Sequence, residues 1–211
     1  VCSSDLFAKA AEVMARFAAP FDLPELTLGG GLGVAYVEGE EAPPISEWAR
    51  VLLDACRSLG VRSKVNVEPG RSIVASAAVT LYTVGTIKDI PGVRTYLAVD
   101  GGMSDNPRPM LYGSGYEAFL PRVARAGRPR RVRIVGKHCE SGDVLIFDAA
   151  LPAGVRVGDL LATPVTGAYG HSMASNYNRL TRPPVVFAAD GRHRLVVRRE
   201  TFDDLVRCEV E

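Results

Sequence analysis

The chain has 211 residues, of which 47% are hydrophobic, so it can bury one large core or two small ones. Its 25 basic and 24 acidic side chains leave a formal net charge of +1, which gives no electrostatic reason to expect nucleic acid or an anionic membrane as partner. No apolar run reaches the ~20 residues that a membrane-spanning helix needs.

The first part of the chain has the pattern of alternating helices and strands. Apolar side chains at helical spacing predict a helix over 6–19, and a short strand is expected at 25–28. A second helix is predicted over 45–59, with Ser46 as its N-cap and Gly60 at its C-terminal cap. The inner face of this second helix is expected to consist of Trp48, Val51, Leu52, Ala55 and Leu59.

A strand expected at 64–67 runs directly into Glu68-Pro69-Gly70-Arg71. Strand, helix and strand in this order are typical of a parallel α/β unit, such as a slice of a (β/α)₈ barrel. We place a boundary near residue 72, which divides an α/β part, 1–71, from an all-β part, 72–211, with one helical interruption near 172–178. The strands expected in the second part are 74–87, 96–99, 131–135, 144–147, 160–164 and 195–198.

The four cysteines stand far apart, at positions 2, 56, 139 and 208, without a CxxC pair. This is neither a zinc pattern nor a disulfide framework, so we expect no metal site and a reducing, cytoplasmic setting. Cys139 differs from the others because it lies in Gly-Lys-His-Cys-Glu-Ser-Gly-Asp, residues 136–143, among polar, turn-forming neighbours. A thiol beside a carboxylate on such a loop is unusual outside redox, metal or active sites. A buried structural cysteine is the ordinary alternative.

Two loops in the α/β part are built to hold an anion. Glycines at 29, 30, 31 and 33 let the backbone approach a bound group and present N–H groups to it. The spacing is not a dinucleotide-binding fingerprint, because no helix is expected to open after Gly33. Taken alone, the glycines are also compatible with a plain turn, and Glu68 with an ion pair to Arg71.

The sequence resembles the alanine-racemase-like, or fold III, decarboxylases, which use pyridoxal phosphate (PLP). The Cys-Glu-Ser-Gly-Asp spelling is most similar to that of the diaminopimelate decarboxylases within this family. The resemblance implies that residues 1–71 are the last βα units of a PLP-binding (β/α)₈ barrel. Residues 72–211 would then form an alanine-racemase-like C-terminal β-barrel domain. The matching segments, in the family's order, are 28–33, 67–71, 100–112, 136–143 and 167–178.

The resemblance also implies roles for single residues. Glu68 would pair with the protonated pyridine nitrogen of PLP, which lets the ring accept the electrons that decarboxylation leaves. Cys139 would donate the proton that replaces CO₂, which a thiol can do near neutral pH. The residues expected to bind the cofactor are Gly30, Gly31, Glu68, Pro69, Gly70, Arg71 and Tyr169. Those expected to bind the substrate are Arg71, Arg108, Tyr112, Glu140 and Tyr169.

The implied activity is the decarboxylation of meso-2,6-diaminopimelate to L-lysine and CO₂. Arginine side chains suit the distal carboxylate of this substrate, and Glu140 suits its distal ammonium. Arg108 is alternatively a loop arginine that caps carbonyls, and Tyr169 an aromatic that packs on a neighbouring core. The family works as a homodimer in which the cysteine loop of one subunit completes the site of the other. Decarboxylation of ornithine, arginine or carboxynorspermidine is the alternative activity, and a catalytically inactive regulatory homologue is the third interpretation.

The chain lacks the lysine that carries PLP in this family. Its lysines are Lys9, Lys64, Lys88 and Lys137, and none has the setting of that residue. We therefore expect a piece of a longer protein that is inactive by itself, and whether residues 1–5 are native stays open. Lys137-His138 departs from the family's usual spelling before the cysteine, so His138 receives no role.

Overall fold

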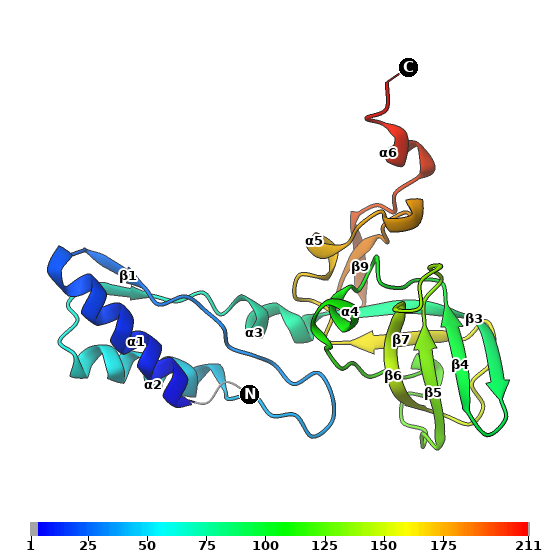
Figure 1. Ribbon diagram of the computed structural model, residues 1–211, viewed down its shortest axis with the longest axis horizontal. Coiled ribbons are helices and arrows are strands. Elements are labelled where there is room, and N and C mark those ends of the chain that lie inside the picture. The colour runs from blue at the N-terminus through cyan, green and yellow to red at the C-terminus, as the bar shows by residue number, and fades with distance from the viewer. Residues whose placement is uncertain (1–3, 211) are drawn as a thin grey trace. The chain divides into compact units, whose positions relative to one another are not determined.

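The computed structural model describes residues 4–210 and divides into two compact units, Val1–Ala78 and Val79–Glu211. The first unit has helices beside a short parallel sheet, and the second has a curled sheet with short helices (Figure 1). The boundary expected near residue 72 falls inside the last helix of the first unit. Cys2 lies outside the described residues.

In the first unit, β1 and β2 pair in parallel, with Leu26 beside Val65. This confirms the parallel pairing predicted for the strands on either side of the second helix. The helices α1 and α2, dark blue and cyan, lie side by side next to this pair (Figure 1). The elements are α1 (Ser4–Ala18), the 3₁₀ turn η1 (Ala19–Phe21), β1 (Glu25–Thr27), α2 (Ile45–Ser58), β2 (Lys64–Asn66), α3 (Gly70–Val74) and the 3₁₀ turn η2 (Ala75–Ala77).

The core of the first unit joins both long helices to the glycine-rich loop. Leu32 of that loop is buried together with Ala11 of α1 and Trp48 of α2. The Phe7 ring meets the Trp48 ring edge-on, with 5.9 Å between centroids. Each fully buried large apolar side chain stabilises the fold by about 1.5–3 kcal/mol, so Leu32 anchors the loop firmly.

The start of α2 differs from the sequence prediction. Pro44 is the N-cap, and its carbonyl accepts the first helical hydrogen bond, from the Trp48 N–H at 3.0 Å. Ser46 was therefore the wrong N-cap, because it is already the second residue of the helix. Pro44 has a non-helical backbone, with φ −58° and ψ 144°, and its missing N–H costs no helical hydrogen bond at this position.

The end of α2 follows the prediction at Gly60, which adopts a left-handed φ of +68°. The Gly60 N–H bonds to the Arg57 carbonyl at 3.1 Å and the Val61 N–H to the Cys56 carbonyl at 3.0 Å, the pair of bonds that defines a Schellman motif. Leu59 was wrongly placed on the inner face, because it is 39% exposed. Cys56 is buried there instead, as expected for a structural cysteine.

The strand predicted over 74–87 was wrong at its beginning. Residues 70–77 are helical, as α3 and η2, and β3 begins only at Val79. The Ser72 hydroxyl donates to the Pro69 carbonyl at 2.8 Å inside this helical turn. Ile73 and Val74 favour strands by type, but the alanines that follow favour a helix, and the local hydrogen bonding decides.

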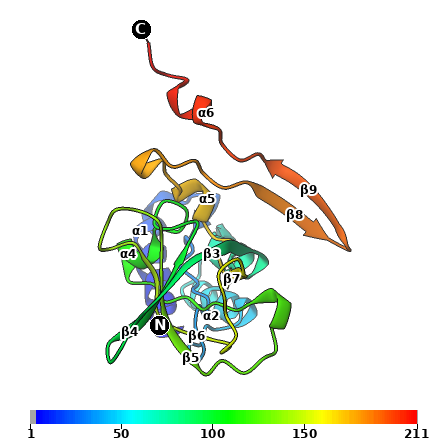
Figure 2. The same cartoon turned by 90° about the vertical axis from the view of Figure 1, so that its right-hand side faces the viewer.

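The second unit contains a five-stranded sheet in the order β6-β5-β4-β3-β7. The β4–β5 pair is parallel, and the other pairs are antiparallel. A two-stranded pair, β8–β9, follows it in the chain and is drawn in orange in Figure 2. The strands are β3 (Val79–Ile90), β4 (Arg94–Val99), β5 (Arg130–Val135), β6 (Val144–Leu151), β7 (Leu160–Pro164), β8 (Val185–Ala189) and β9 (Arg192–Val197).

The sheet curls at β3. Its first half, Val79–Thr83, pairs with β7, while Val84–Ile90 pairs with β4 on the other side. The register shifts between Val84 and Thr86, as at a β-bulge, which bends the strand and increases its twist. The curled sheet encloses a core whose largest fully buried side chains are Val84, Leu97, Leu120, Val132, Ile134, Leu151 and Leu161.

The second unit holds more helix than the single interruption predicted near 172–178. At that place the structure has α5 and the turn η4, and two further helices were missed, as was strand β8. The last helix carries a capping box between Thr201 and Asp204, which explains its formation despite its short length. These elements are η3 (Pro121–Val123), α4 (Arg108–Tyr112), α5 (Gly170–Met173), η4 (Tyr177–Arg179) and α6 (Phe202–Val206). Among the described residues, no helix is long and apolar enough to cross a membrane.

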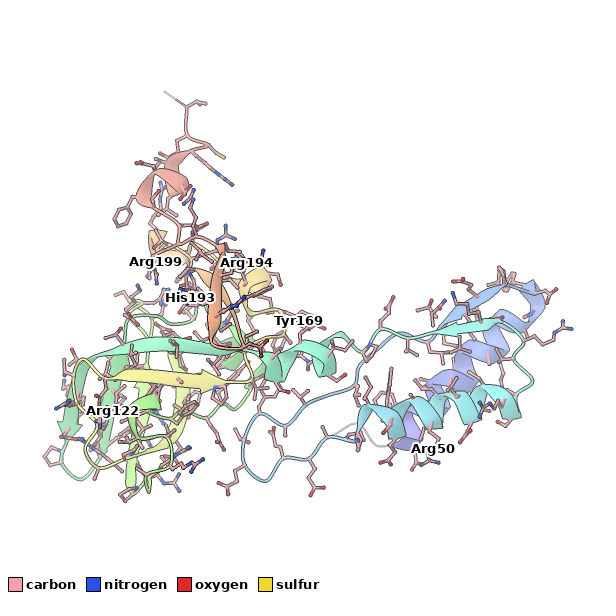
Figure 3. All side chains as sticks on the ribbon, turned by 180° about the vertical axis from the view of Figure 1, so that it is seen from behind. Arg50, Arg122, Tyr169, His193, Arg194 and Arg199 are labelled. Atoms are coloured by element: carbon pink, nitrogen blue, oxygen red, sulfur yellow. The ribbon has the colours of Figure 1, made fainter. Side chains whose placement is uncertain are left out.

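One ion pair closes the turn before β7. The Asp159 side chain, 5% exposed, accepts from Arg122 Nε at 2.7 Å and from Arg122 Nη2 at 2.8 Å. The Arg156 N–H adds a bond of 3.0 Å. The hydrogen bonds from Arg122, which is labelled in Figure 3, hold the pKa of Asp159 below its usual value. The charged form of Asp159 therefore stabilises the second unit.

We predict that Asp159→Asn lowers the free energy of unfolding by about 1–3 kcal/mol at neutral pH, because bonds to a charged acceptor are lost. A lowered carboxyl pKa contributes stability above the unfolded-state value and loses it as the pH falls through the folded-state value. The difference in unfolding free energy between Asp159→Asn and wild type should therefore shrink below about pH 4. Urea unfolding at several pH values measures it, with Asp148→Asn on an exposed carboxylate as control. A pH-independent difference would contradict this account.

Candidate active site

In the first unit, the loops after β1 and β2 lie next to each other. The Leu28 N–H bonds to the Asn66 carbonyl at 3.0 Å and the Glu68 N–H to the Gly29 carbonyl at 2.8 Å, which extends the pairing beyond both strands. Ligands of α/β proteins bind at the carboxyl ends of parallel strands. The two segments predicted to hold an anion are therefore brought together at such an end.

Glycine is required at two positions of this loop pair. A Cβ atom on Gly30 would collide with the carbonyl oxygen of Glu68, so a side chain there would push the loops apart. Gly31 has a φ of +87°, which favours glycine. The close approach of the two backbones exists only because residue 30 has no side chain.

Arg71 lies in the first turn of α3, directly after Glu68-Pro69-Gly70. Its guanidinium donates a hydrogen bond to the Tyr36 hydroxyl and lies 6.0 Å from the centroid of the Tyr36 ring. Glu68 is exposed, whereas Arg71 is half-buried. Tyr36 belongs to the long loop after the glycines and was not singled out in the sequence. It fixes the direction of an arginine at the carboxyl end of the strands.

In the second unit, two loops are joined in the same way, because β4 and β5 are parallel neighbours. The loop after β4 holds residues 100–106, and the loop after β5 holds residues 136–143. The Lys137 N–H donates to the Gly101 carbonyl at 3.0 Å. The cysteine loop is thus fixed to the Asp-Gly-Gly-Met segment.

The carboxylate of Asp143 is the centre of this junction, and its side chain is 2% exposed. It accepts from the Met103 N–H at 2.7 Å and from the His138 N–H at 2.8 Å. The Nδ1 of His138 lies 2.7 Å from the same carboxylate, and it is the donor there if the carboxylate is ionised. Three bonds from two loops therefore converge on one buried side chain.

A second carboxylate lies behind this junction. Asp105 accepts from the Gly102 N–H at 2.8 Å, and burial raises the pKa of Asp105 above its usual value. The buried Tyr82 ring lies close to Gly101, and burial also raises the Tyr82 pKa well above its usual value. The surroundings of Asp105 and Tyr82 are therefore largely shielded from water, and hydrogen bonds between polar groups are stronger in such surroundings.

Cys139 and Glu140 are both exposed at the tip of the cysteine loop, and Cys139 is a free thiol. Glu140 accepts a hydrogen bond from the Tyr177 hydroxyl, and this bond raises the pKa of Tyr177. The Tyr177 ring stacks on the His138 ring with 6.0 Å between centroids and 25° between planes. The loop thus presents a thiol and an oriented carboxylate to solvent.

Helix α4 carries the expected substrate-binding pair Arg108 and Tyr112. The buried Arg108 guanidinium donates to the Ser114 hydroxyl at 3.1 Å and lies 5.2 Å from the Tyr112 ring centroid. Tyr112 is 64% exposed. A Cβ on Gly142 would lie 3.8 Å from the Met110 side chain, so the helix packs beside the cysteine loop. Helix α4 and the cysteine loop therefore lie in the same part of the second unit.

Tyr169, labelled in Figure 3, precedes α5 and has a left-handed φ of +68°. Such a backbone is uncommon outside glycine and costs energy, so the surrounding structure must impose it. Its side chain is 44% exposed rather than packed in the core. The Ser175 N–H, in the same segment, donates to the Ser104 carbonyl at 2.9 Å, which brings this segment to the junction around Asp143.

The structure therefore groups the predicted residues into two sets. Sequence reasoning missed His138, Asp143, Tyr177 and Tyr36. Asp143 was interpreted only as a turn-forming residue. His138 departs from the family's usual sequence before the cysteine, so it was given no role and its hydrogen bond to Asp143 was not predicted. Among residues 4–210, no group of three or more His, Cys, Asp or Glu side chains is arranged to hold a metal ion. The first unit holds Gly30, Gly31, Glu68, Pro69, Gly70 and Arg71, and the second holds Arg108, Tyr112, Cys139, Glu140 and Tyr169.

Comparison with known proteins identifies the family. The family described as "Pyridoxal-dependent decarboxylase, C-terminal sheet domain" matches residues 2–167. The chain belongs to the pyridoxal-dependent decarboxylases. The diaminopimelate decarboxylase of Synechocystis sp. is 50% identical over 190 residues, which are 88% of this chain and 40% of that protein. That of Actinosynnema pretiosum is 52% identical over 194 residues, 89% of this chain and 44% of that protein.

Solved structures of this family agree with the fold. Diaminopimelate decarboxylase from M. jannaschii, in co-complex with L-lysine, superposes with a TM-score of 0.90 at 30% identity. It covers 100% of this chain, which in turn covers 50% of that structure. The chain therefore spans half or less of the length of these relatives.

We predict that Gly30→Ala destabilises the first unit by about 1–3 kcal/mol, because the added methyl group forces the two loops apart. Gly33→Ala is the matched control: it lies in the same loop, but nothing lies within 4 Å of its Cβ position. We expect that variant to stay within about 0.5 kcal/mol of wild type. Urea unfolding of both variants measures the difference, and equal losses would refute the role given to the close approach.

Proposed function

We propose that the full-length protein decarboxylates meso-2,6-diaminopimelate to L-lysine and CO₂ with PLP as its cofactor. The observation that carries the proposal is the exposed Cys139–Glu140 pair, fixed by buried Asp143, in a chain 50% identical to a diaminopimelate decarboxylase. A thiol supplies a proton, and the neighbouring carboxylate supplies a counter-ion for an ammonium group. Glu140 rather than aspartate directly after the cysteine favours this substrate over ornithine.

The residues of the first unit fit PLP, although the lysine that carries it is not among them. The phosphate is an anion, and the loop around Gly30 permits close backbone approach to such a group. Gly31, Pro69, Gly70 and Arg71 would complete the phosphate site, and the exposed Glu68 would pair with the pyridine nitrogen. When bound, PLP supplies an electron sink for the pair left by the departing CO₂.

The protein's own side chains would then do the rest of the chemistry. Arg108 and Tyr112 would bind the distal carboxylate of the substrate, and Glu140 its distal ammonium. Tyr169 would contact both substrate and cofactor. Cys139 would hold the proton that is delivered to the substrate carbon from which CO₂ has left. Because its side chain is exposed on a fixed loop, delivery needs no rearrangement of the core.

We further propose that residues 1–71 are the last βα units of a PLP-binding (β/α)₈ barrel, and that residues 72–211 form the C-terminal β-barrel domain. The parallel β1–β2 pair supports the first assignment. Large apolar side chains on α1 support it too, since Leu6, Val13 and Phe17 are at least 59% exposed and need a partner surface.

The proposed assembly is a homodimer in which Cys139 of one subunit serves the PLP of the other. The exposed tip of the cysteine loop supports this, because it is free to reach another chain. Phe187 on β8 and Leu195 on β9, 61% and 58% exposed, would give such a dimer apolar surface to bury. A cytoplasmic location fits the free thiols and stays a prediction.

The activity is tested with the full-length protein, PLP and a panel of substrates. We expect lysine release from meso-2,6-diaminopimelate, measured by amino-acid analysis, to exceed product formation from ornithine, arginine or carboxynorspermidine by at least about 100-fold in kcat/KM, a difference of about 2.7 kcal/mol. Comparable rates with ornithine would move the assignment to a related decarboxylase. No turnover of any of these substrates would favour the non-catalytic interpretation.

Replacing the proposed proton donor should separate turnover from binding. Cys139→Ala is expected to lower kcat by roughly 100-fold or more, the usual worth of a general acid, and to leave KM within about threefold. Cys208→Ala, at another exposed free thiol, is the control and should keep wild-type kinetics. Equal losses in kcat and in substrate affinity would remove the proton-donor role.

A site formed by two subunits can be recognised by mixing two inactive variants. Cys139→Ala and Glu68→Ala protomers are each inactive alone, but a mixed dimer contains one complete site. Random one-to-one mixing should therefore restore about a quarter of wild-type activity, since about half the dimers are mixed and each has one of two sites intact. No recovery after verified subunit exchange would place Cys139 and Glu68 in the same protomer's site.

A further inference from the structure

We propose that Tyr177 is a specificity-determining residue, which orients the Glu140 carboxylate toward the distal ammonium of the substrate. The inference rests on the proposed function, because it concerns the substrate that Glu140 binds. Its physical basis is a chain of contacts in the second unit that runs from buried Asp143 through His138 to Tyr177 and Glu140.

The first step is the fixed position of the His138 ring. Its side chain is fully buried, and its Nδ1 bonds to the Asp143 carboxylate at 2.7 Å. Within residues 4–210 its Nε2 has no hydrogen-bond partner. Burying a ring nitrogen without a hydrogen-bond partner costs free energy. The buried ring gives Tyr177 a flat, fixed surface on which to stack.

The second step is the backbone around Tyr177. The two residues that follow it, Asn178 and Arg179, have left-handed φ values of +55° and +58°. Consecutive non-glycine residues in this region are strained, at roughly 1–3 kcal/mol each for sparsely populated conformations. A turn without a function would relax, so the strain indicates that the direction of the Tyr177 side chain matters.

The third step is the anchor that maintains the strained turn. Asn176 Nδ2 donates to the Leu180 carbonyl at 3.0 Å and to Glu200 at 2.6 Å. Glu200 also accepts from Arg182 Nε at 2.7 Å, and these bonds lower the pKa of Glu200 to about 2. Glu200 therefore remains ionised at any physiological pH and keeps the turn closed.

The final step is the chemistry at Glu140. The Tyr177 hydroxyl donates to Oε1 of the Glu140 carboxylate. This bond removes the rotational freedom of an exposed side chain and leaves Oε2 to accept from a ligand ammonium. A carboxylate that is oriented before the ligand arrives loses less entropy on binding, so the phenol increases affinity for ligands that carry the ammonium and for no others.

The test compares two ligands that differ only in that group, on the full-length protein. The distal centre of the substrate becomes the α-carbon of L-lysine, so the α-ammonium is the group that Glu140 would bind. 6-Aminohexanoate has the same carbon chain without it. We expect Tyr177→Phe, which keeps the stacked ring and removes the hydroxyl, to weaken L-lysine binding about tenfold in calorimetry and to leave 6-aminohexanoate binding unchanged. Tyr96→Phe, a tyrosine on β4, is the matched control and should change neither.

The outcomes separate the two proposals. Glu140→Gln should weaken L-lysine binding at least as much as Tyr177→Phe, and the double variant should lose no more than Glu140→Gln alone, because the two side chains act as a unit. If Glu140→Gln weakens binding and Tyr177→Phe does not, the role of Tyr177 is refuted and the proposed function stands. Equal loss for both ligands in Tyr177→Phe would likewise refute it, since it would indicate a general structural role.

A spectroscopic measurement tests the contact even if the full-length protein binds no lysine. In an ultraviolet titration of the 211-residue chain, Glu140→Gln should let one tyrosine ionise at lower pH than in wild type, because the carboxylate no longer raises the Tyr177 pKa. The same change should be absent when Glu140→Gln is made in the Tyr177→Phe background. An unchanged titration in Glu140→Gln would overturn the inference independently of the enzyme's substrate.

Discussion

The buried carboxylate of Asp143 is the interaction on which the rest of the second unit's site depends. It takes hydrogen bonds from the backbone of two different loops and from the ring of His138. A buried carboxylate is tolerated only when its oxygen atoms are satisfied, so both loops must stay where they are. The positions of Cys139, Glu140 and Tyr177 all follow from that constraint.

Each unit brings its own candidate residues together by the same rule. In the first, the loops after parallel strands β1 and β2 are joined by the bond between Glu68 and Gly29. In the second, the loops after parallel strands β4 and β5 are joined through Lys137, Gly101 and Asp143. Parallel neighbours end at the same edge of a sheet, so side chains distant in sequence meet there without a long connection.

How much of the fold and of the candidate site could be predicted depends on how far apart in the sequence the deciding residues lie. The glycine-rich loop and Glu68-Pro69-Gly70-Arg71 were recognisable because backbone requirements are written locally, in glycine and proline. Likewise Gly60 marked the end of α2. Ser46 failed as a cap because the helix begins one residue before it, with Pro44 as N-cap. The strand expected from residue 74 failed because Ile73 and Val74 favour a strand while the alanines after them favour a helix.

The role of Asp143 could not be predicted, because it requires the pairing of β4 with β5, which are separated by thirty residues in the sequence. His138 and Tyr177 depend in turn on Asp143 and on the strained turn at 178–179, for which the sequence has no glycine as a signal. Family resemblance supplied the proposed reacting groups, whereas the residues proposed to orient them came only from the three-dimensional contacts.

The left-handed pair Asn178–Arg179 has a consequence for engineering this protein. Arg179 also pairs with Glu209 at 2.6 Å, so the residue that bears strain ties the end of the chain to the turn. Glycine adopts a left-handed φ without strain, so Arg179→Gly would relieve the backbone, but it would also remove the ion pair to Glu209. Under the role proposed for Tyr177, thermal stability and ligand selectivity therefore make opposite demands on this turn. A variant library selected for heat resistance alone would lose selectivity for the ammonium.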